Sequence, residues 1–362
     1  MTTEPDGSIV TFYSFKGGTG RTMALANVAW ILAANGKRVL VVDWDLESPG
    51  LHRYFSPFLG RDAFERQRTV IGLVQDFQDY MRDRDPDDES PPEYAARADL
   101  SDRVVALDWD RFPGAGRLDL LPAGRLNRDY ATVLSWLKWD DFYERHAGGP
   151  FLDAVRAEMR RRYDYVLIDS RTGYSDVADI CTVHMPDTLV LCFTLNEQGI
   201  EGASAVARQV EEHKRHIRIM PVPMRLDAAE KEKSEAIRAF AKERFEGLPE
   251  AEDRESRDRY WNTVFVPYQA YYNYEERLAT IGDPAGVQGT LLAAYEKLTS
   301  ELTGGEVSAL PPMEADLRSR VNEQFERRLT VAERSIALRY SPADRIWAEW
   351  LTDVLNRAGI RV

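Results

Sequence analysis

The chain has 362 residues, which is enough for two domains or for one large α/β domain with attachments. Of these residues 44% are hydrophobic and 30% are charged, as in a globular protein that buries a hydrophobic core. Sixty acidic residues against 47 basic ones give a formal charge of −13, which argues against general binding of nucleic acid. Because there are only two cysteines and no apolar run near the ~20 residues that span a bilayer, we expect a cytoplasmic globular protein without a disulfide scaffold or membrane segment.

The first fifty residues predict a strand–turn–helix–strand unit. We expect a buried strand over residues 8–14, an apolar helix over 23–35 and a buried parallel strand over 38–43. The glycine-rich turn between the first two has the sequence Lys16-Gly17-Gly18-Thr19-Gly20-Arg21-Thr22. Glycines let successive N–H groups point at one anion, and the helix N-terminus adds partial positive charge. The turn therefore predicts a phosphate site, with the Thr22 hydroxyl placed to ligate Mg²⁺; the alternative is a turn that binds nothing.

This turn resembles the deviant Walker A motif of the ParA/MinD group of P-loop ATPases. Four later motifs follow in the order that this family shows: Val42-Asp43-Trp44-Asp45 at the switch I strand, Leu120-Leu121-Pro122-Ala123-Gly124, Tyr163 to Asp169 as the Walker B strand, and Val266-Pro267-Tyr268 in the loop that packs against the base. The resemblance covers residues 8–303. It implies an α/β fold, the three-layer sandwich of P-loop NTPases with a mostly parallel sheet, here followed by a short C-terminal βα extension.

The resemblance also implies a role for each matching residue. ATP would lie between two subunits, with Lys16 reaching across to the partner's phosphates. The nucleotide would be bound by Lys16, Gly17, Gly18, Thr19, Gly20, Arg21, Thr22, Met23, Arg171, Arg225, Pro267 and Tyr268. Mg²⁺ would be held by Thr22, Asp43, Asp45 and Asp169. The predicted catalytic residues are then Lys16, Asp45 (beside the attacking water) and Asp169, and the predicted cofactors are ATP and Mg²⁺. For Asp43 and Asp45 the alternative is a simple strand-end turn.

Three departures from the family pattern qualify these roles. Arg21 replaces the P-loop lysine; its planar fork keeps the charge, so we expect binding to survive and hydrolysis to be slow. Met224 stands where the family has an asparagine that reads adenine, so ATP rather than GTP rests on the resemblance alone. Arg171 lies in an unusual loop after Asp169, where it could sense the γ-phosphate, bridge to a partner subunit or form a surface ion pair.

Four further segments have predictable roles in this unit. Residues 81–93 are charged and contain prolines, which predicts a mobile surface loop. The aromatic residues within 129–146 predict a part of the hydrophobic core or of a subunit interface rather than a ligand-binding site. Residues 228–244 indicate a surface helix followed by a solvated connection over 246–258, and 287–302 suit the last helix of the unit.

The remainder divides into a linker or helical connector over 304–330 and a partial TIR-like βα segment over 331–362. We expect strands over 335–341 and 360–362, with an amphipathic helix between them whose apolar face carries Trp347, Trp350, Leu351, Val354 and Leu355. The stretch Ser341 to Leu351 resembles the start of a TIR domain, so we expect the chain to be part of a longer protein. The alternative is a C-terminal helix docked on the ATPase-like unit. Membrane attachment is not expected, because acidic residues lie on the helix's polar face.

These observations favour a nucleotide-dependent homodimer with weak Mg²⁺-dependent ATPase activity, an ATP hydrolase that acts in signalling or defence and binds protein partners through its C-terminal extension. A nucleotide-binding scaffold without turnover is the alternative, favoured by Arg21. A DNA-partitioning ATPase is disfavoured by the net charge. A bacterial tyrosine kinase of related fold would carry a tyrosine cluster at its C-terminus. That interpretation is disfavoured because the only tyrosine cluster in this sequence is internal, at Tyr271, Tyr272 and Tyr274.

Overall fold

The computed structural model describes residues 6–60, 69–85, 87–124, 130–173, 179–214, 216–227, 231–273, 275–326, 338, 340–341 and 344–357. The chain divides into two compact units, Met1–Pro312 and Met313–Val362, and each is described by itself. Among the described residues, no helix is long and apolar enough to cross a membrane.

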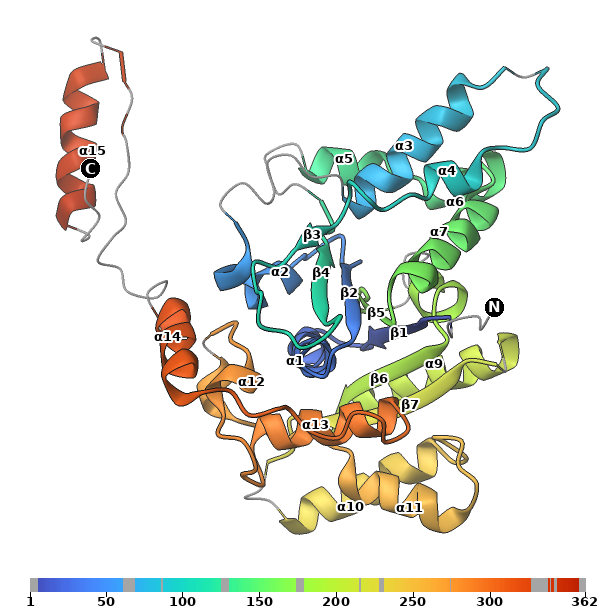
Figure 1. Ribbon diagram of the computed structural model, residues 1–362, viewed down its shortest axis with the longest axis vertical. Coiled ribbons are helices and arrows are strands. Elements are labelled where there is room, and N and C mark those ends of the chain that lie inside the picture. The colour runs from blue at the N-terminus through green and yellow to red at the C-terminus, as the bar shows by residue number, and fades with distance from the viewer. Residues whose placement is uncertain are drawn as a thin grey trace. The chain divides into compact units, whose positions relative to one another are not determined.

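The first unit is built on a seven-stranded sheet with the order β3-β4-β2-β5-β1-β6-β7 (Figure 1). The strands are β1 Ser8–Tyr13, β2 Arg38–Asp43, β3 Val105–Ala106, β4 Arg117–Leu121, β5 Tyr165–Asp169, β6 Thr188–Thr194 and β7 Arg218–Met224. Neighbouring strands pair in parallel except β3, which pairs antiparallel with β4. The predicted α/β fold with a mostly parallel sheet is confirmed.

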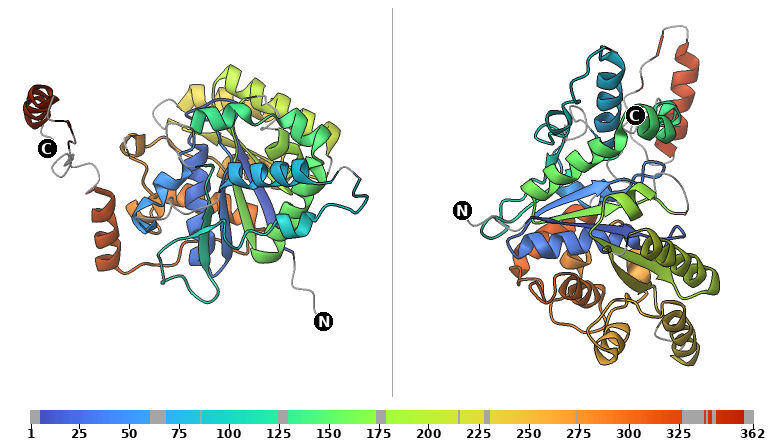
Figure 2. Two further views of the ribbon diagram at one scale, coloured as in Figure 1. Left: turned by 90° about the horizontal axis from the view of Figure 1, so that it is seen from above. Right: turned by 90° about the vertical axis from the view of Figure 1, so that its right-hand side faces the viewer.

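Helices cover both faces of this sheet (Figure 2). The longer ones are α1 Arg21–Ala34, α3 Val70–Asp83, α7 Gly148–Arg162, α9 Glu197–His213, α10 Lys231–Arg244, α11 Arg254–Thr263 and α13 Leu291–Leu302. The short ones are α2 Leu51–Tyr54, η1 Ser56–Phe58, α4 Tyr94–Arg97, α5 Tyr130–Trp136, α6 Trp139–Arg145, η2 Ile180–His184, η3 Ala270–Asn273 and α12 Ala279–Gly282. Leu40 and Val42 of β2 belong to one core cluster with α3, α6 and α7. Val39 and Val41 alternate with them and therefore face the opposite layer, where α1 packs against α13.

The strand order brings the predicted motifs to one edge of the sheet. In the β2–β5 register Asp43 lies opposite Asp169, and in the β1–β5 register Phe12 lies opposite Asp169. Because carboxyl ends of parallel strands share an edge, the turn after β1 and both aspartates meet there.

One predicted connection is helical in the structure. Residues 254–258 were expected to belong to a solvated connection, but they form the first half of α11. The Asp253 side chain caps this helix by accepting a hydrogen bond from the Ser256 N–H at 2.7 Å, and Tyr260 and Trp261 anchor it in the core. In the aromatic segment, Leu137, Trp139 and Phe142 are buried, as predicted for core residues, and Trp136 is 74% exposed, so for Trp136 the predicted alternative of a subunit interface stays open.

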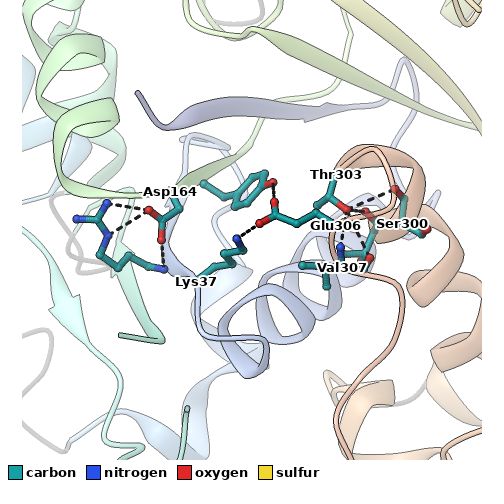
Figure 3. A network of polar contacts seen from close by, with 9 residues as sticks. Lys37, Asp164, Ser300, Thr303, Glu306 and Val307 are labelled. Atoms are coloured by element: carbon teal, nitrogen blue, oxygen red, sulfur yellow. Dashed lines mark hydrogen bonds and ion pairs between the residues drawn. The ribbon is translucent and has the colours of Figure 1, made fainter. Parts of the chain in front are cut away.

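The segment after α13 is attached to the amino-terminal ends of β2 and β5 (Figure 3). The Glu306 carboxylate accepts hydrogen bonds from the Tyr165 hydroxyl at 3.3 Å and from the Lys37 ammonium. The Thr303 hydroxyl accepts from the Val307 N–H at 3.0 Å. The beginning of the predicted linker, which starts at residue 304, is therefore packed on the first unit.

The second unit contains α14 Ala315–Glu326 and α15 Arg345–Arg357. The predicted amphipathic helix corresponds to α15, where the rings of Trp347 and Trp350 meet edge to face with centroids 6.3 Å apart. The strand predicted over 335–341 lies largely outside the described residues, and its described members 338, 340 and 341 are not in a strand. The strand predicted over 360–362 lies outside them entirely.

Candidate functional site

The glycine-rich turn leads directly from β1 into α1. Gly18 and Gly20 have φ angles of 73° and 93°, a left-handed conformation that glycine adopts without steric cost. Gly20 is also the N-cap of α1, so the first N–H groups of that helix have no capping side chain. A turn of this shape directs backbone donors and the helix dipole toward one position, as phosphate binding requires.

A cavity of about 470 Å³ opens above this turn. It is lined by Ser14, Gly17, Gly18, Thr19, Gly20, Arg21, Thr22, Met23, Asp45, Glu47, Ser48, Tyr54, Arg171, Thr172, Arg225 and Tyr272. A larger cavity of about 580 Å³ lies between α3 and residues 96–103, but no phosphate-binding turn borders it. The cavity above the turn is the candidate site because it combines the turn with Asp45 of the predicted switch I motif and with the predicted Arg171 and Arg225.

Arg21 is the central charged group of the site. It is 5% exposed, and its guanidinium donates from Nε to Oδ1 of Asp169 at 2.6 Å and from Nη2 to Oδ2 of Asp45 at 3.0 Å. Burial lowers the pKa of Arg21, but the two carboxylates outweigh it and hold the pKa above its ordinary value, so the side chain stays charged. One cation therefore joins the predicted switch I and Walker B carboxylates.

Asp169 also accepts a 2.7 Å hydrogen bond from the Thr22 hydroxyl, through its second oxygen Oδ2. Burial raises the pKa of this carboxyl; Arg21 and Thr22 act in the opposite direction without cancelling the shift. The Thr22 and Asp169 oxygens are the type of hard donor that Mg²⁺ prefers, and they lie at the edge of the phosphate turn.

Asp43, at the end of β2, is buried and does not line the cavity. Its Oδ2 accepts from the Leu51 N–H at 3.2 Å, and burial, followed by the charges of Asp169 and Asp45, raises its pKa well above the ordinary value. Within the described part of the chain, no group of three or more His, Cys, Asp or Glu side chains is arranged to hold a metal ion. The metal site of Thr22, Asp43, Asp45 and Asp169 thus stays a prediction, with Arg21 now placed between two of its members.

Lys16 lies outside the cavity lining. Its ammonium donates to the side-chain oxygen of Gln198, in the first turn of α9. This position, at the surface beside the turn, leaves the predicted reach toward a partner subunit untested.

The predicted Arg171 and Arg225 both line the cavity. Arg171 pairs with Glu47 at 2.7 Å, which matches the ion-pair alternative for this residue. Arg225 has a φ of 59°, unusual for a residue other than glycine, and donates from Nη1 to the Gly18 carbonyl at 2.8 Å. Arg225 thereby attaches the end of β7 to the phosphate turn.

The predicted base-contacting residues Pro267 and Tyr268 lie outside the lining, although the Arg225 guanidinium stands 5.1 Å from the centre of the Tyr268 ring. Two tyrosines that we did not predict line it instead. Tyr54 comes from α2, and Tyr272 comes from η3, where its hydroxyl donates to Oδ1 of Asp283 at 2.7 Å. Tyr272 belonged to a visible tyrosine cluster, whereas no sequence signal pointed to Tyr54.

Ser14, Glu47, Ser48 and Thr172 also line the cavity without having been predicted. Each lies within three residues of a predicted site residue. Extending each motif by three residues in both directions would therefore have identified all four. Met224 is buried beneath the turn, with its Cε 3.5 Å from where a Cβ on Gly20 would lie. It fills space under the phosphate turn.

Unpartnered polar atoms test whether the site suits a nucleotide. Nη1 of Arg21 and the hydroxyl of Thr19 are buried and have no hydrogen-bond partner among the described residues, and both residues line the cavity. A Cβ built on Gly17 or Gly18 would meet no described atom within 4 Å. The turn thus borders open space and offers free donors, which fits a polyphosphate, while the Thr22 and Asp169 oxygens fit a Mg²⁺ ion.

Comparisons with known proteins agree with this geometry. The family model of the CobQ/CobB/MinD/ParA nucleotide binding domain matches residues 10–259. An uncharacterized ATP-binding protein of Methanocaldococcus jannaschii is 46% identical over 69 residues, which are 18% of this chain and 26% of that protein. The chain therefore aligns with about a quarter of the length of this relative.

Two solved structures show a similar fold. The septum site-determining protein MinD of Pyrococcus horikoshii, in complex with Mg-ADP, has a TM-score of 0.54 at 17% identity, covering 82% of this chain and 96% of that one. A McdA variant of Cyanothece, in complex with ATP, has a TM-score of 0.55 at 15% identity, covering 86% of this chain and 100% of that one. At such identities the likeness is one of fold.

Proposed function

Because the chain belongs to the CobQ/CobB/MinD/ParA nucleotide-binding family, we propose that it is an ATP-dependent dimerisation switch that hydrolyses ATP slowly with Mg²⁺. The observation that carries this proposal is Arg21, whose side chain lines the 470 Å³ cavity above the glycine-rich turn and whose buried nitrogen Nη1 has no partner within the described chain. A free cationic donor beside backbone N–H groups suits the phosphates of a nucleotide.

Each group of the site then has a task. The N–H groups of the turn and Arg21 hold the phosphates, while Arg225 keeps the turn in shape through the Gly18 carbonyl. Thr22 and Asp169 would hold Mg²⁺, which would supply positive charge to the phosphate oxygens when bound. Asp45 orients the attacking water and accepts its proton.

Slow hydrolysis follows from the bonds that Asp45 already makes. Its Oδ2 accepts from Arg21 at 3.0 Å and its Oδ1 accepts from the Ser48 N–H at 3.3 Å. Both carboxylate oxygens are therefore engaged before water arrives, and the attacking water has to compete with Arg21 and the Ser48 N–H for them. The same bonds favour a second candidate, a nucleotide-binding scaffold without turnover.

Phosphate release from Mg-ATP tests the enzymatic part. We expect slow release by the wild-type protein and none by Asp45→Ala, with nucleotide binding kept in both. Binding without release in the wild type would instead support the scaffold. Absence of any nucleotide-induced rise in melting temperature would contradict both candidates.

Sizing by light scattering tests the dimer. We expect ATP to convert the wild type to a dimer and Lys16→Ala to stay monomeric, since Lys16 lies at the surface beside the turn. Lys214→Ala, which changes an exposed lysine at the far end of α9, is the matched control and should dimerise normally. An unchanged oligomeric state of the wild type with ATP would contradict the switch.

We further propose that dimerisation brings together C-terminal segments that act on protein partners in signalling or defence, with residues 331–362 as the start of a TIR-like domain. The amphipathic α15, with its paired Trp347 and Trp350, supports an interaction role. The coding sequence downstream of Val362 tests this directly: a TIR domain in frame would support it, and an immediate stop codon would contradict it.

A further inference from the structure

Two of the three guanidinium nitrogens of Arg21 bind carboxylates, and the third is free. Nε binds Asp169 and Nη2 binds Asp45, whereas the buried Nη1 has no partner in the described residues, and the Arg21 side chain lines the cavity. We propose that Arg21 is the resident cation of this phosphate site, so that a nucleoside polyphosphate binds to Nη1 without needing a divalent metal ion. This inference rests on the proposed nucleotide binding and extends it.

The first step of the argument is electrostatic. Asp45 and Asp169 carry negative charge at the edge of the turn that would receive the phosphates, and like charges repel a polyanion strongly at low dielectric. A divalent ion can remove this repulsion in a nucleotide site. Here a guanidinium contacts both carboxylates at 3.0 Å or less, so a positive charge is built into the chain at that place.

The second step is geometric. The guanidinium has five N–H donors in a rigid fork, so it can keep both carboxylates and still present Nη1 to an anion. A lysine in the same position has a single nitrogen and cannot span both carboxylates while facing the cavity. The replacement of lysine by arginine therefore changes which ions the site needs, besides preserving its charge.

The third step concerns the surrounding charges. Among the other cavity-lining residues described, Glu47 is paired with Arg171 at 2.7 Å, and Arg225 adds a further positive charge bound to the Gly18 carbonyl. The turn itself contributes the N-terminus of α1, whose cap Gly20 has no side chain. A polyphosphate thus meets positive groups on several sides before any metal arrives, and the metal is required for hydrolysis alone.

The test measures binding of ADP to the full chain by calorimetry, in excess Mg²⁺ and in EDTA. We expect the wild-type Kd in EDTA to stay within about threefold of the Kd in Mg²⁺. Arg21→Lys should bind ADP about tenfold or more weakly in EDTA than in Mg²⁺, because one nitrogen cannot both neutralise the carboxylates and hold the phosphate. Arg208→Lys, an arginine-to-lysine change on the exposed side of α9, is the matched control and should keep the wild-type behaviour.

Inorganic pyrophosphate is the second probe, since it lacks the base and the sugar. It should displace ADP from the wild-type protein in EDTA. Wild-type binding in Mg²⁺ but not in EDTA would overturn the inference and leave the proposed function standing. Absence of binding in both buffers would overturn the proposed function itself. Equal binding of wild type and Arg21→Lys in EDTA would show that another group neutralises the site, and the inference would then be wrong.

Discussion

Oδ1 of Asp169 accepts a 2.6 Å hydrogen bond from Nε of Arg21, and the two residues, 148 positions apart in the chain, are both buried. The bond joins the first turn of α1 to the end of β5. It therefore couples the phosphate turn to the predicted Walker B strand, and the stability of the unit depends on the same groups as its chemistry.

Removing one member of this buried pair should destabilise the fold. Asp169→Asn leaves the Arg21 charge with one carboxylate fewer, and we expect a loss of about 3 kcal/mol in the free energy of unfolding. Asp45→Asn should cost less, because the Asp45 side chain is 14% exposed and Arg21 keeps Asp169. Urea denaturation followed by circular dichroism measures both, and equal losses in the two variants would contradict this ranking.

The glycine-rich turn allows a test in which only the backbone conformation differs. A Cβ on Gly17 or on Gly18 would meet no described atom within 4 Å, but only Gly18 of the two has a left-handed φ, of 73°. We expect Gly18→Ala to lower the unfolding free energy by about 1–2 kcal/mol. Gly17→Ala is the control and should have little effect on urea stability. A comparable loss in Gly17→Ala would mean that a contact, rather than the φ angle, sets the cost.

The environment of Asp164 allows a prediction of how the stability of the fold changes at acid pH. Burial alone would raise the pKa of Asp164, but hydrogen bonds from Arg38, whose Nη2 lies 2.7 Å from Oδ1 and whose N–H lies 2.7 Å from Oδ2, lower it overall. A carboxyl whose pKa is lower in the folded state stabilises the fold above its unfolded pKa, about 4, and this contribution is lost as the pH falls through the folded pKa.

Asp164→Asn should therefore lower the unfolding free energy at pH 7 by about 1 kcal/mol and flatten the loss of stability below pH 4. Urea midpoints between pH 3 and pH 7 measure this. Asp110→Asn, at an exposed position on the same unit, is the control and should follow the wild-type curve. An Asp164→Asn curve parallel to that of the wild type would count against this role of Arg38.

The aromatic segment separates a core residue from a surface residue. Phe142 is fully buried, and its ring packs edge to face on Phe77 and Phe151 with centroids 6.3 Å away. Phe142→Ala should cost about 3–5 kcal/mol of unfolding free energy. Trp136→Ala, at a side chain that is 74% exposed, should change it by less than about 0.5 kcal/mol in the isolated chain. A large loss for Trp136→Ala would mean that this side chain is buried by a contact such as an interface.

Much of the first unit could be predicted from local pattern. The apolar runs of β1, β2 and β5 are continuous because these strands are buried on both faces, and that pattern is visible without a structure. The prediction for segment 254–258 was wrong because this segment has no apolar pattern. Its charged residues suit solvent in any conformation, so only the Asp253 cap and the burial of Tyr260 identify it as helix.

The motifs of the candidate site could be predicted from the sequence, but the residues that reach these motifs from distant elements could not. Glycines in a turn between a strand and a helix are typical of a phosphate site, so Gly18, Gly20 and Thr22 could be proposed from the sequence. Tyr54 could not, because it lines the cavity only through the tertiary packing of α2. Nor could the engagement of Lys16 with Gln198, which depends on where α9 begins relative to the turn.

The sequence by itself determined the fold class, and it predicted the glycine-rich turn and the three aspartates as a candidate site, since each of these depends on residue types and spacings close together in the chain. Only the tertiary structure decided that Arg21 binds Asp45 and Asp169 together. That arrangement requires β5 to lie between β2 and β1, so that residues from three separate segments meet at one edge of the sheet. Strand order depends on the packing of the whole unit, and a guanidinium takes the partners that this packing brings within hydrogen-bonding distance.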